Sequence, residues 1–217
     1  MAVLATERSR VQHLLRRAAF GYSAGELDEY VALGLKGTVE RLLSPEAIDD
    51  SATEARVESL DLGDMEEERI KLFQAWHVRL QTTRRPLLEK LTYFWHDHFA
   101  TGMRKVGRAV PMHVQNATLR EHALGSFPEL LLATARDPAM LVWLDNRSNS
   151  KAAPNENYAR ELMELHTLGE GNAYTETDIK EAARAHRMAC QPRRHTLLAS
   201  SPRRRNEDCA RRQRHVR

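Results

Sequence analysis

The chain has 217 residues, of which 41% are hydrophobic and 29% charged, as in an ordinary globular protein with one domain or at most two small ones. No stretch approaches the roughly 20 apolar residues of a membrane span. The N-terminus turns polar too early for a secretion signal, so we expect a cytoplasmic protein as the sequence stands. The net charge of +3 divides unevenly, because residues 187–217 hold ten arginines against two acids and leave −5 for residues 1–186. This acidic body argues against a nucleic-acid partner.

Helix start signals and apolar stripes recur along residues 1–186, and no segment alternates at period two. The sequence therefore predicts an all-α, multi-helix bundle-like domain. A capping box at Ser23 begins a helix that Gly34 ends, and a short helix follows at 35–43. The acidic segment 46–63 is predicted to be a linker or a loosely held helix.

Two amphipathic helices are expected next. The first covers 64–83, and the second begins at Pro86 and carries His98 on its apolar side. The apolar stripe of the first helix consists of Ile70, Phe73, Trp76 and Leu80. Further helices are expected at 113–124 and from Asn155 to about Leu168. Two short helices are expected between them, one after a capping box at Ser126 and one after an Asp137 cap. A last helix follows a capping box at Thr175, with Tyr174 and Ile179 as a hydrophobic staple.

The best candidate for a site is the polar region between Asp145 and Glu164. Asn157, Glu161 and Glu164 are spaced i, i+4, i+7 and share one helix face. The two glutamates could bind a divalent cation through oxygen or act as an acid/base pair, with Asp145 as a further metal candidate. The alternative is a solvated helix face, or carboxylates that pair with a nearby arginine such as Arg160.

The histidines are a second source of candidates. His96 and His98 point about 200° apart on a helix, so one ion could not easily bind both. His98 continues an apolar stripe, which is typical of a hydrogen-bonded core histidine. His122 could face the same cleft as the glutamates. His166 is not three residues after a glutamate, so the di-metal Glu-x-x-His motif is rejected.

Several segments resemble one bacterial family, "domain of unknown function 1800", over about residues 11–186. The resemblance implies a helical fold with recurrent polar motifs, among which His96, Asn155, Glu156, Asn157 and Arg160 fall. Family members are usually longer, often exported, and often encoded beside a sulfatase-like protein. The matching segments are Leu14-Leu15-Arg16-Arg17-Ala18-Ala19-Phe20-Gly21, Phe94-Trp95-His96-Asp97-His98-Phe99, Leu119-Arg120-Glu121-His122-Ala123-Leu124-Gly125 with Arg136-Asp137-Pro138-Ala139-Met140-Leu141, Leu144-Asp145-Asn146, and Pro154-Asn155-Glu156-Asn157-Tyr158-Ala159-Arg160-Glu161-Leu162-Met163-Glu164-Leu165.

The resemblance stops near Ala185, where the family usually continues with Thr-Gly-Trp. A shift of one base in the codons of residues 186–190 restores Thr-Gly-Trp, so we hypothesise a frameshift near codon 186. The domain would then be the N-terminal part of a larger helical fold. The rival hypothesis is a genuine basic arm for nucleic acid or acidic lipid. In either case the tail at 187–217 has too few large apolar residues to pack and is predicted to be disordered.

Three functions remain open. The first is a truncated family member without activity of its own, which we favour for this chain. The second is a metal-assisted, hydrolytic enzyme of unknown substrate that uses Glu161 and Glu164 with His98 or His122. The third is a non-catalytic scaffold that binds a partner protein, with the motif residues forming buried structural networks.

Overall fold

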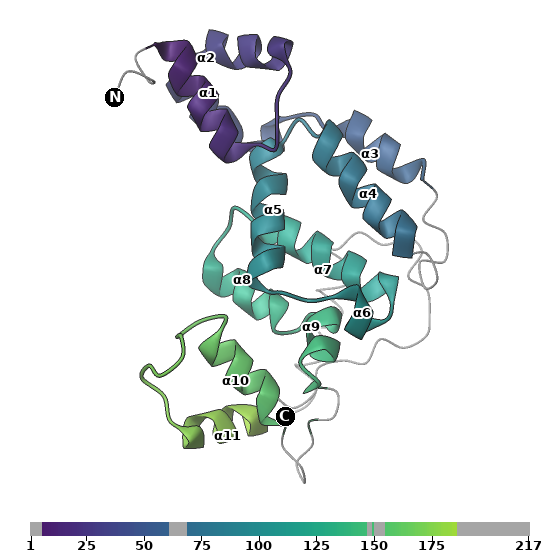
Figure 1. The fold of residues 1–217 in the computed structure, drawn as a ribbon, viewed down its shortest axis with the longest axis vertical. Coiled ribbons are helices and arrows are strands. Elements are labelled where there is room, and N and C mark those ends of the chain that lie inside the picture. The colour runs from purple at the N-terminus through teal and green to yellow at the C-terminus, as the bar shows by residue number, and fades with distance from the viewer. Residues whose placement is uncertain (1–5, 61–68, 147–148, 150–154, 186–217) are drawn as a thin grey trace.

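The computed structural model describes residues 6–60, 69–146, 149 and 155–185, so the predicted tail at 187–217 lies outside the described residues. The described residues form helices joined by turns and contain no strand, which confirms the all-α class. In Figure 1, α1 and α2 lie at one end of the molecule, α10 and α11 lie at the other, and α5 to α9 lie between them. The helices are α1 (Glu7–Ala18), α2 (Ala24–Leu43), the 3-10 turn η2 (Pro45–Ala47), α3 (Ser51–Glu58), α4 (Arg69–Thr82), α5 (Pro86–His98), α6 (Met103–Val106), α7 (Ala109–His122), α8 (Phe127–Thr134), α9 (Pro138–Trp143), α10 (Glu156–Glu164) and α11 (Glu176–Ala185).

The helices α1 and α2 form an N-terminal hairpin with a small core of its own. Thr6 and Ser23 begin the two helices with reciprocal capping boxes, of which the sequence predicted the second. Gly34 adopts a left-handed φ of 70° and breaks α2 into two stretches, at the position of the predicted stop. The side chains buried between the helices are Val11, Leu15, Ala18, Leu27, Tyr30 and Leu42.

The acidic segment at 46–63, predicted to be a linker or a loosely held helix, contains α3. The Glu54 carboxylate accepts hydrogen bonds from both terminal nitrogens of Arg79 on α4. Asp50 is buried just before α3 and accepts a hydrogen bond from the Thr83 hydroxyl at 2.7 Å. These contacts fix α3 to the C-terminal end of α4, so the acids of this segment pair with specific donors.

The apolar stripe predicted on α4 is buried only in part. Ile70 and Phe73 are 74% and 63% exposed, and the buried residue of this helix is Ala75. Trp76 is half-buried and its ring contacts His96 of α5 at 5.0 Å. The prediction was wrong for the first turns of α4, because periodicity reports which face is apolar and not whether another helix covers that face.

The central helix α5 buries a polar face against α7. Glu89 is almost completely buried, and its carboxylate accepts hydrogen bonds from Arg120 Nε at 2.6 Å and Nη2 at 3.0 Å. The buried Thr92 hydroxyl donates to the Leu88 carbonyl at 2.8 Å. A buried carboxylate is tolerated only when it is paired, so this bidentate contact fixes the register of α5 on α7.

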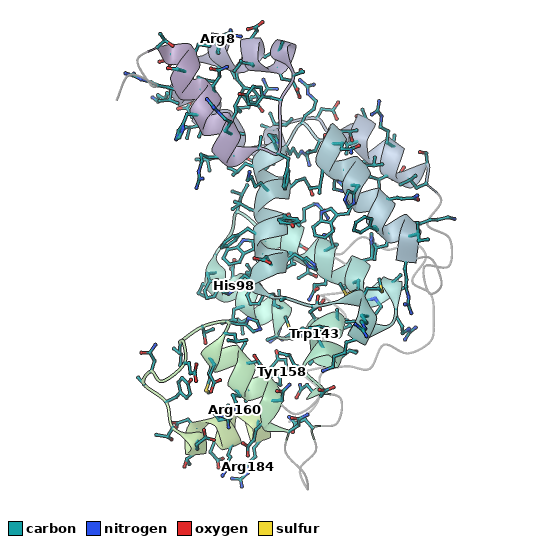
Figure 2. All side chains as sticks on the ribbon, in the orientation of Figure 1. Arg8, His98, Trp143, Tyr158, Arg160 and Arg184 are labelled. Carbon is teal, nitrogen blue, oxygen red and sulfur yellow. The ribbon has the colours of Figure 1, made fainter. Side chains whose placement is uncertain are left out.

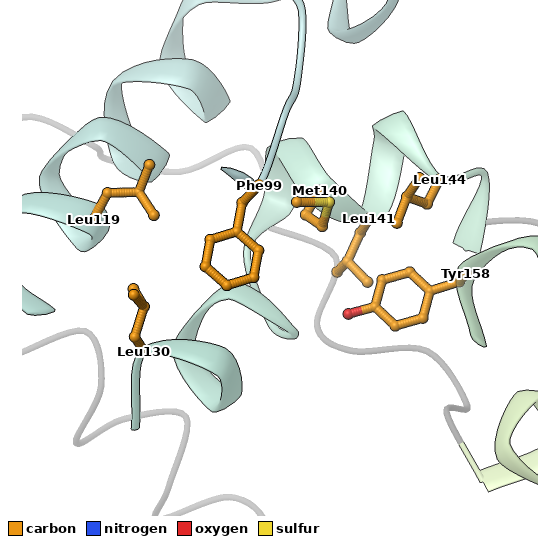
Figure 3. Close-up of a cluster of buried hydrophobic side chains, with 7 residues drawn as sticks. All are labelled: Phe99, Leu119, Leu130, Met140, Leu141, Leu144 and Tyr158. Carbon is orange, nitrogen blue, oxygen red and sulfur yellow. The ribbon is translucent and has the colours of Figure 1, made fainter. Parts of the chain in front are cut away.

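A second core lies where α7, α8, α9 and α10 meet. Tyr158 of α10 extends across Leu141 of α9, and its hydroxyl donates to the Ala135 carbonyl at 3.0 Å (Figure 3). Burial of this apolar set holds the polar segment after α9 against the rest of the fold. The buried members are Phe99, Leu119, Leu130, Met140, Leu141, Leu144 and Tyr158.

The start signals of the later helices are confirmed in most cases. Thr175 exchanges hydrogen bonds with Asp178 before α11, and Tyr174 packs with the fully buried Ile179, as the predicted staple requires. Ser126 makes no side-chain capping bond before α8, so the capping box predicted there is wrong. Within the described ranges, no helix is both long and apolar enough to cross a membrane.

Candidate functional site

The segment that joins α9 to α10 is held by asparagine side chains. The side-chain oxygen of Asn155 accepts the Asn157 main-chain N–H at 3.0 Å, and its amide nitrogen donates to the Asp145 carbonyl at 2.9 Å. Asn157 donates its side-chain amide to the Leu144 carbonyl at 3.3 Å. The two motif asparagines therefore begin α10 and fix it to the end of α9.

Two further asparagines extend these contacts to α11. Asn146 and Asn149 are both buried. Asn149 Nδ2 donates to Asn146 Oδ1 at 3.0 Å and to the Ala183 carbonyl at 2.8 Å, and Asn149 Oδ1 accepts the Asn155 N–H at 3.1 Å. The side chain of Asn149 thus joins the end of α9, the start of α10 and the end of α11. We call Asn146, Asn149, Asn155 and Asn157 the asparagine network.

Asp145, a predicted metal candidate, lies at the start of this segment. It has a left-handed φ of 59°, which asparagine and aspartate tolerate better than most side chains. Its carboxylate lies 2.8 Å from Lys105 Nζ, and the same ammonium donates to the Trp143 carbonyl. The negative charge of Asp145 is therefore paired with a lysine from α6.

Arg160 joins α10 to α11 through carboxylates. Its two terminal nitrogens donate to Glu176 at 2.8 and 2.7 Å, and they lie 3.5 Å from Glu156 and 3.4 Å from Glu164. The hydrogen bonds from Arg160 lower the pKa of the Glu176 carboxyl, and they raise the pKa of the guanidinium in turn. Of the two candidate glutamates, Glu164 pairs with Arg160, as the alternative to a metal site expected, and Glu161 forms no ion pair with it. Figure 2 shows Arg160 between the two C-terminal helices.

The two glutamates predicted as metal ligands or as an acid/base pair have different surroundings. Glu164 pairs with Arg160, so its charge is already balanced. Glu161 is half-buried, and its carboxylate forms no hydrogen bond or ion pair with any residue that the structure describes. Of the two, Glu161 is the carboxylate that remains available for a ligand.

His98 and His166 meet in space from distant parts of the sequence. His98 Nε2 lies 3.2 Å from the His166 carbonyl oxygen, and the ring centroids are 5.8 Å apart. His166 is 6% exposed, and its Nδ1 has no hydrogen-bond partner among the described residues. Burial, together with the neighbouring His98, lowers the pKa of His166, which therefore favours the neutral imidazole.

A wide turn after α10 brings His166 inward. The prediction that the helix continues to about Leu168 is wrong, because α10 ends at Glu164. The main-chain N–H of Leu168 bonds to the Met163 carbonyl at 2.7 Å, one residue farther apart than in an α-helix. Gly169, with a φ of 84°, completes the turn.

The remaining histidine candidates lie elsewhere. His96 packs its ring on Trp76, and burial lowers its pKa. His122 is half-buried in the last turn of α7. Over the described ranges, no three His, Cys, Asp or Glu side chains gather closely enough to hold a metal ion. The metal set of Glu161, Glu164, Asp145 and a histidine therefore remains a prediction.

A buried polar cluster around Asp137 was missed at the sequence level. Asp137 caps α9 through the Met140 N–H at 2.9 Å, as predicted, and it also accepts Gln115 Nε2 at 3.1 Å from α7. Its other oxygen is buried without a partner in the described part of the chain, and burial raises the pKa of this carboxyl to about 7. The sequence marks a helix cap here, but the burial of its charge depends on how α7 packs against α9.

The fold and the candidate site define an all-α protein whose recurrent polar motifs connect its helices to one another. The sequence matches, over residues 13–186, the model of a family described as protein of unknown function (DUF1800). The chain therefore belongs to the DUF1800 family, as its motifs indicated. No curated protein and no solved structure matches the chain.

Proposed function

We propose that this chain is a non-catalytic helical scaffold that binds a partner protein. The observation that carries the proposal is how the motif side chains use their polar atoms. Asn155 and Asn157 bond to main-chain groups of neighbouring segments, and Arg160 bonds to Glu176 of the next helix. Polar side chains that bond to neighbouring segments in this way rigidify a fold, and the polar atoms they use for it are not available to a substrate.

An apolar surface beside the paired histidines supports the binding of a protein. Phe94 and Phe127 are exposed, and both rings contact His98. Leu165 and Leu168 are exposed on the turn that follows α10, and the His166 carbonyl of the same turn contacts His98. We call Phe94, Phe127, Leu165 and Leu168 the His98 surface. Exposed aromatic and aliphatic side chains of this kind are typical of the centre of a protein interface.

The family resemblance suggests the nature of the partner, because DUF1800 members are often encoded beside a sulfatase-like protein. The test is co-expression of this chain with a sulfatase-like protein of the kind encoded beside family members, followed by size-exclusion chromatography. We expect a complex that Phe94→Ser weakens by about tenfold or more. Leu43→Ser, which replaces an exposed leucine of α2, is the matched control and should bind normally. The absence of a complex, or equal binding by both variants, would count against the scaffold.

A metal-assisted hydrolytic enzyme is the second proposal, and the unpaired carboxylate of Glu161 supports it. A metal held by Glu161 and Glu164, with His98, His122 or Asp145 as further ligands, would activate water. The test is the metal content of the purified protein by mass spectrometry, with Glu161→Gln as the variant. Because the Glu161 carboxylate bonds to no described residue, this variant should fold normally. Stoichiometric metal lost in Glu161→Gln would support the enzyme, whereas a folded, metal-free wild-type protein would oppose it.

A third proposal is that the chain is a truncated family member without activity of its own. It rests on the abrupt end of the resemblance and on the Thr-Gly-Trp that a shifted frame restores. Exposed apolar residues such as Phe73 would then face the missing part. Resequencing the gene across codons 180 to 217 tests it: a shifted frame that stays open supports truncation, and the present frame, if confirmed, removes it.

A further inference from the structure

A pocket of about 470 Å³ lies between the N-terminal hairpin and the turn from α4 to α5. Its walls come from α1, α2 and residues 80–86, far from the asparagine network. The volume is in the range of sites that bind small molecules. Apolar side chains, Leu15 and Leu80 among them, line part of it, and charged side chains of both signs line the rest.

One charged wall includes Arg41, whose side chain is only partly satisfied by the residues that the structure describes. Arg41 stacks its guanidinium 4.9 Å from the Tyr30 ring centroid, and its Nη2 lies 3.7 Å from Glu29, which is too far for a hydrogen bond. The Arg41 Nε is buried and has no partner among the described residues. A guanidinium offers five donors, and an unsatisfied buried donor in a native protein calls for an explanation such as a ligand.

Two further residues with donor groups line the same pocket. Tyr30 is 6% exposed and lines the pocket, and its hydroxyl forms no hydrogen bond with a described residue. Arg84 lines the pocket with an exposed side chain that forms no hydrogen bond or ion pair with a described residue, although its charge acts on the nearby Asp49 carboxyl. Its main-chain N–H bonds to the buried Asp50 at 2.8 Å, which fixes Arg84 in place. Arg41, Tyr30 and Arg84 therefore contribute two guanidinium groups and one phenol to the lining of this pocket.

Carboxylates lie in the same pocket. Glu29 is largely exposed, and Glu26 uses one oxygen to accept the Ser23 N–H in the capping box of α2. Burial raises the pKa of the Tyr30 phenol, and the charges of Arg41, both glutamates and Arg84 act on it as well. The pocket therefore presents two positive and two negative groups to one small volume.

We propose that this pocket binds a small zwitterion, namely an amino acid or a short peptide. The ligand's carboxylate bonds to Arg41, Arg84 and the Tyr30 hydroxyl, and its ammonium faces Glu29. The glutamates repel a phosphate, and the arginines repel a simple amine, so a ligand with both charges fits best. The apolar walls formed by Leu15 and Leu80 accept its side chain. This site is independent of the proposed scaffold function.

Isothermal titration calorimetry on the full-length chain tests the proposal with leucine and the dipeptide alanyl-leucine as probes. We expect saturable binding of at least one probe. The N-acetylated and the C-amidated forms of the better probe should each bind about tenfold more weakly, because each lacks one charge. Inorganic phosphate should not compete. Failure of both probes to bind at about 10 mM, or equal binding of the blocked forms, would overturn the proposal.

Matched variants place the binding in this pocket. Arg84→Gln removes an exposed side chain without a described partner, so it should fold normally and weaken binding by about fivefold or more. Arg104→Gln changes an exposed arginine of α6 and should bind as the wild type does. Tyr30→Phe, checked for folding by circular dichroism, should also weaken binding. Equal affinity of Arg84→Gln and Arg104→Gln would show that the ligand binds elsewhere.

Discussion

Each end of the molecule holds an arginine beside glutamates, and these two arginines are paired in different ways. At the end formed by α10 and α11, Arg160 contacts three carboxylates, with bonds of 2.7 and 2.8 Å to Glu176. At the end formed by α1 and α2, Arg41 has one ion pair within the described ranges, at 3.7 Å, and its Nε finds no acceptor there. A dense polar motif can therefore be a structural device, whereas loosely paired donors in a pocket are better evidence of a ligand.

The largest effect is expected from Asp137 at the start of α9, because one oxygen of its carboxyl group is buried without a partner among the described residues. Burial raises the pKa of its carboxyl from 3.8 to about 7. Between pH 3.8 and about pH 7, the Asp137 carboxyl keeps its proton in the folded chain and has lost it in the unfolded chain. The stability that this group contributes is therefore fully present below pH 3.8 and is lost as the pH rises through 7, a change of about 4 kcal/mol at most.

Asp137→Asn tests this expectation, because asparagine also caps a helix but does not titrate. The measurement is urea unfolding of both proteins at about pH 4.5 and about pH 8, which gives the free energy of unfolding on each side of pH 7. The wild type should lose more stability than the variant between these conditions. Parallel pH profiles would show that Asp137 is not buried as a neutral acid.

Asn149 should have the next largest effect, since its side chain joins three segments. Asn149→Ala leaves the Ala183 carbonyl, the Asn146 side chain and the Asn155 N–H without their present partner. We expect a loss of about 3 kcal/mol in the free energy of unfolding, measured by chemical denaturation. A loss below about 1 kcal/mol would mean that the asparagine network does not hold α10 and α11 to the end of α9.

Arg160→Gln should have a smaller effect, because its ion pairs with Glu176 and Glu156 are accessible to solvent. We expect the melting temperature to fall by about 2 °C at low salt, and the difference to shrink at high salt as the charges are screened. The matched control is Arg184→Gln, which removes only a pair with Glu181 within one helix. Equal shifts for the two variants would contradict a special role for Arg160 between α10 and α11.

Much of the fold could be predicted from the sequence, because helix signals are local. The capping box at Ser23, the break at Gly34 and the staple of Tyr174 on Ile179 each depend on a few adjacent residues. The exposure of Ile70 could not be predicted, since it depends on whether another helix lies over that face. Local pattern fixes helix positions better than it fixes burial.

The candidate site was predictable only where it lies within one segment. The pairing of Arg160 with Glu156 and Glu164 follows from helical spacing. The contact of His98 with His166 spans 68 positions and depends on a turn that ends α10 early. The pocket around Tyr30 draws on separate stretches of chain between Leu15 and Pro86, and the motifs within them, the family segment at 14–21 and the capping box at Ser23, do not indicate a pocket. Contacts of this kind follow from packing, which periodicity does not report.

Arg84→Gln should have the smallest effect on stability, and it sharpens the contrast between the two ends. The side chain is exposed and has no described partner, so the free energy of unfolding without ligand should stay within about 0.5 kcal/mol of the wild-type value. With about 10 mM of the better zwitterionic probe, the wild-type chain should gain thermal stability and Arg84→Gln should gain less, because only a ligand that prefers the folded state stabilises it. If the variant unfolds more easily in the absence of any ligand, then Arg84 stabilises the fold as Arg160 does. The arginines of the pocket would then no longer differ in role from the arginine that joins α10 to α11.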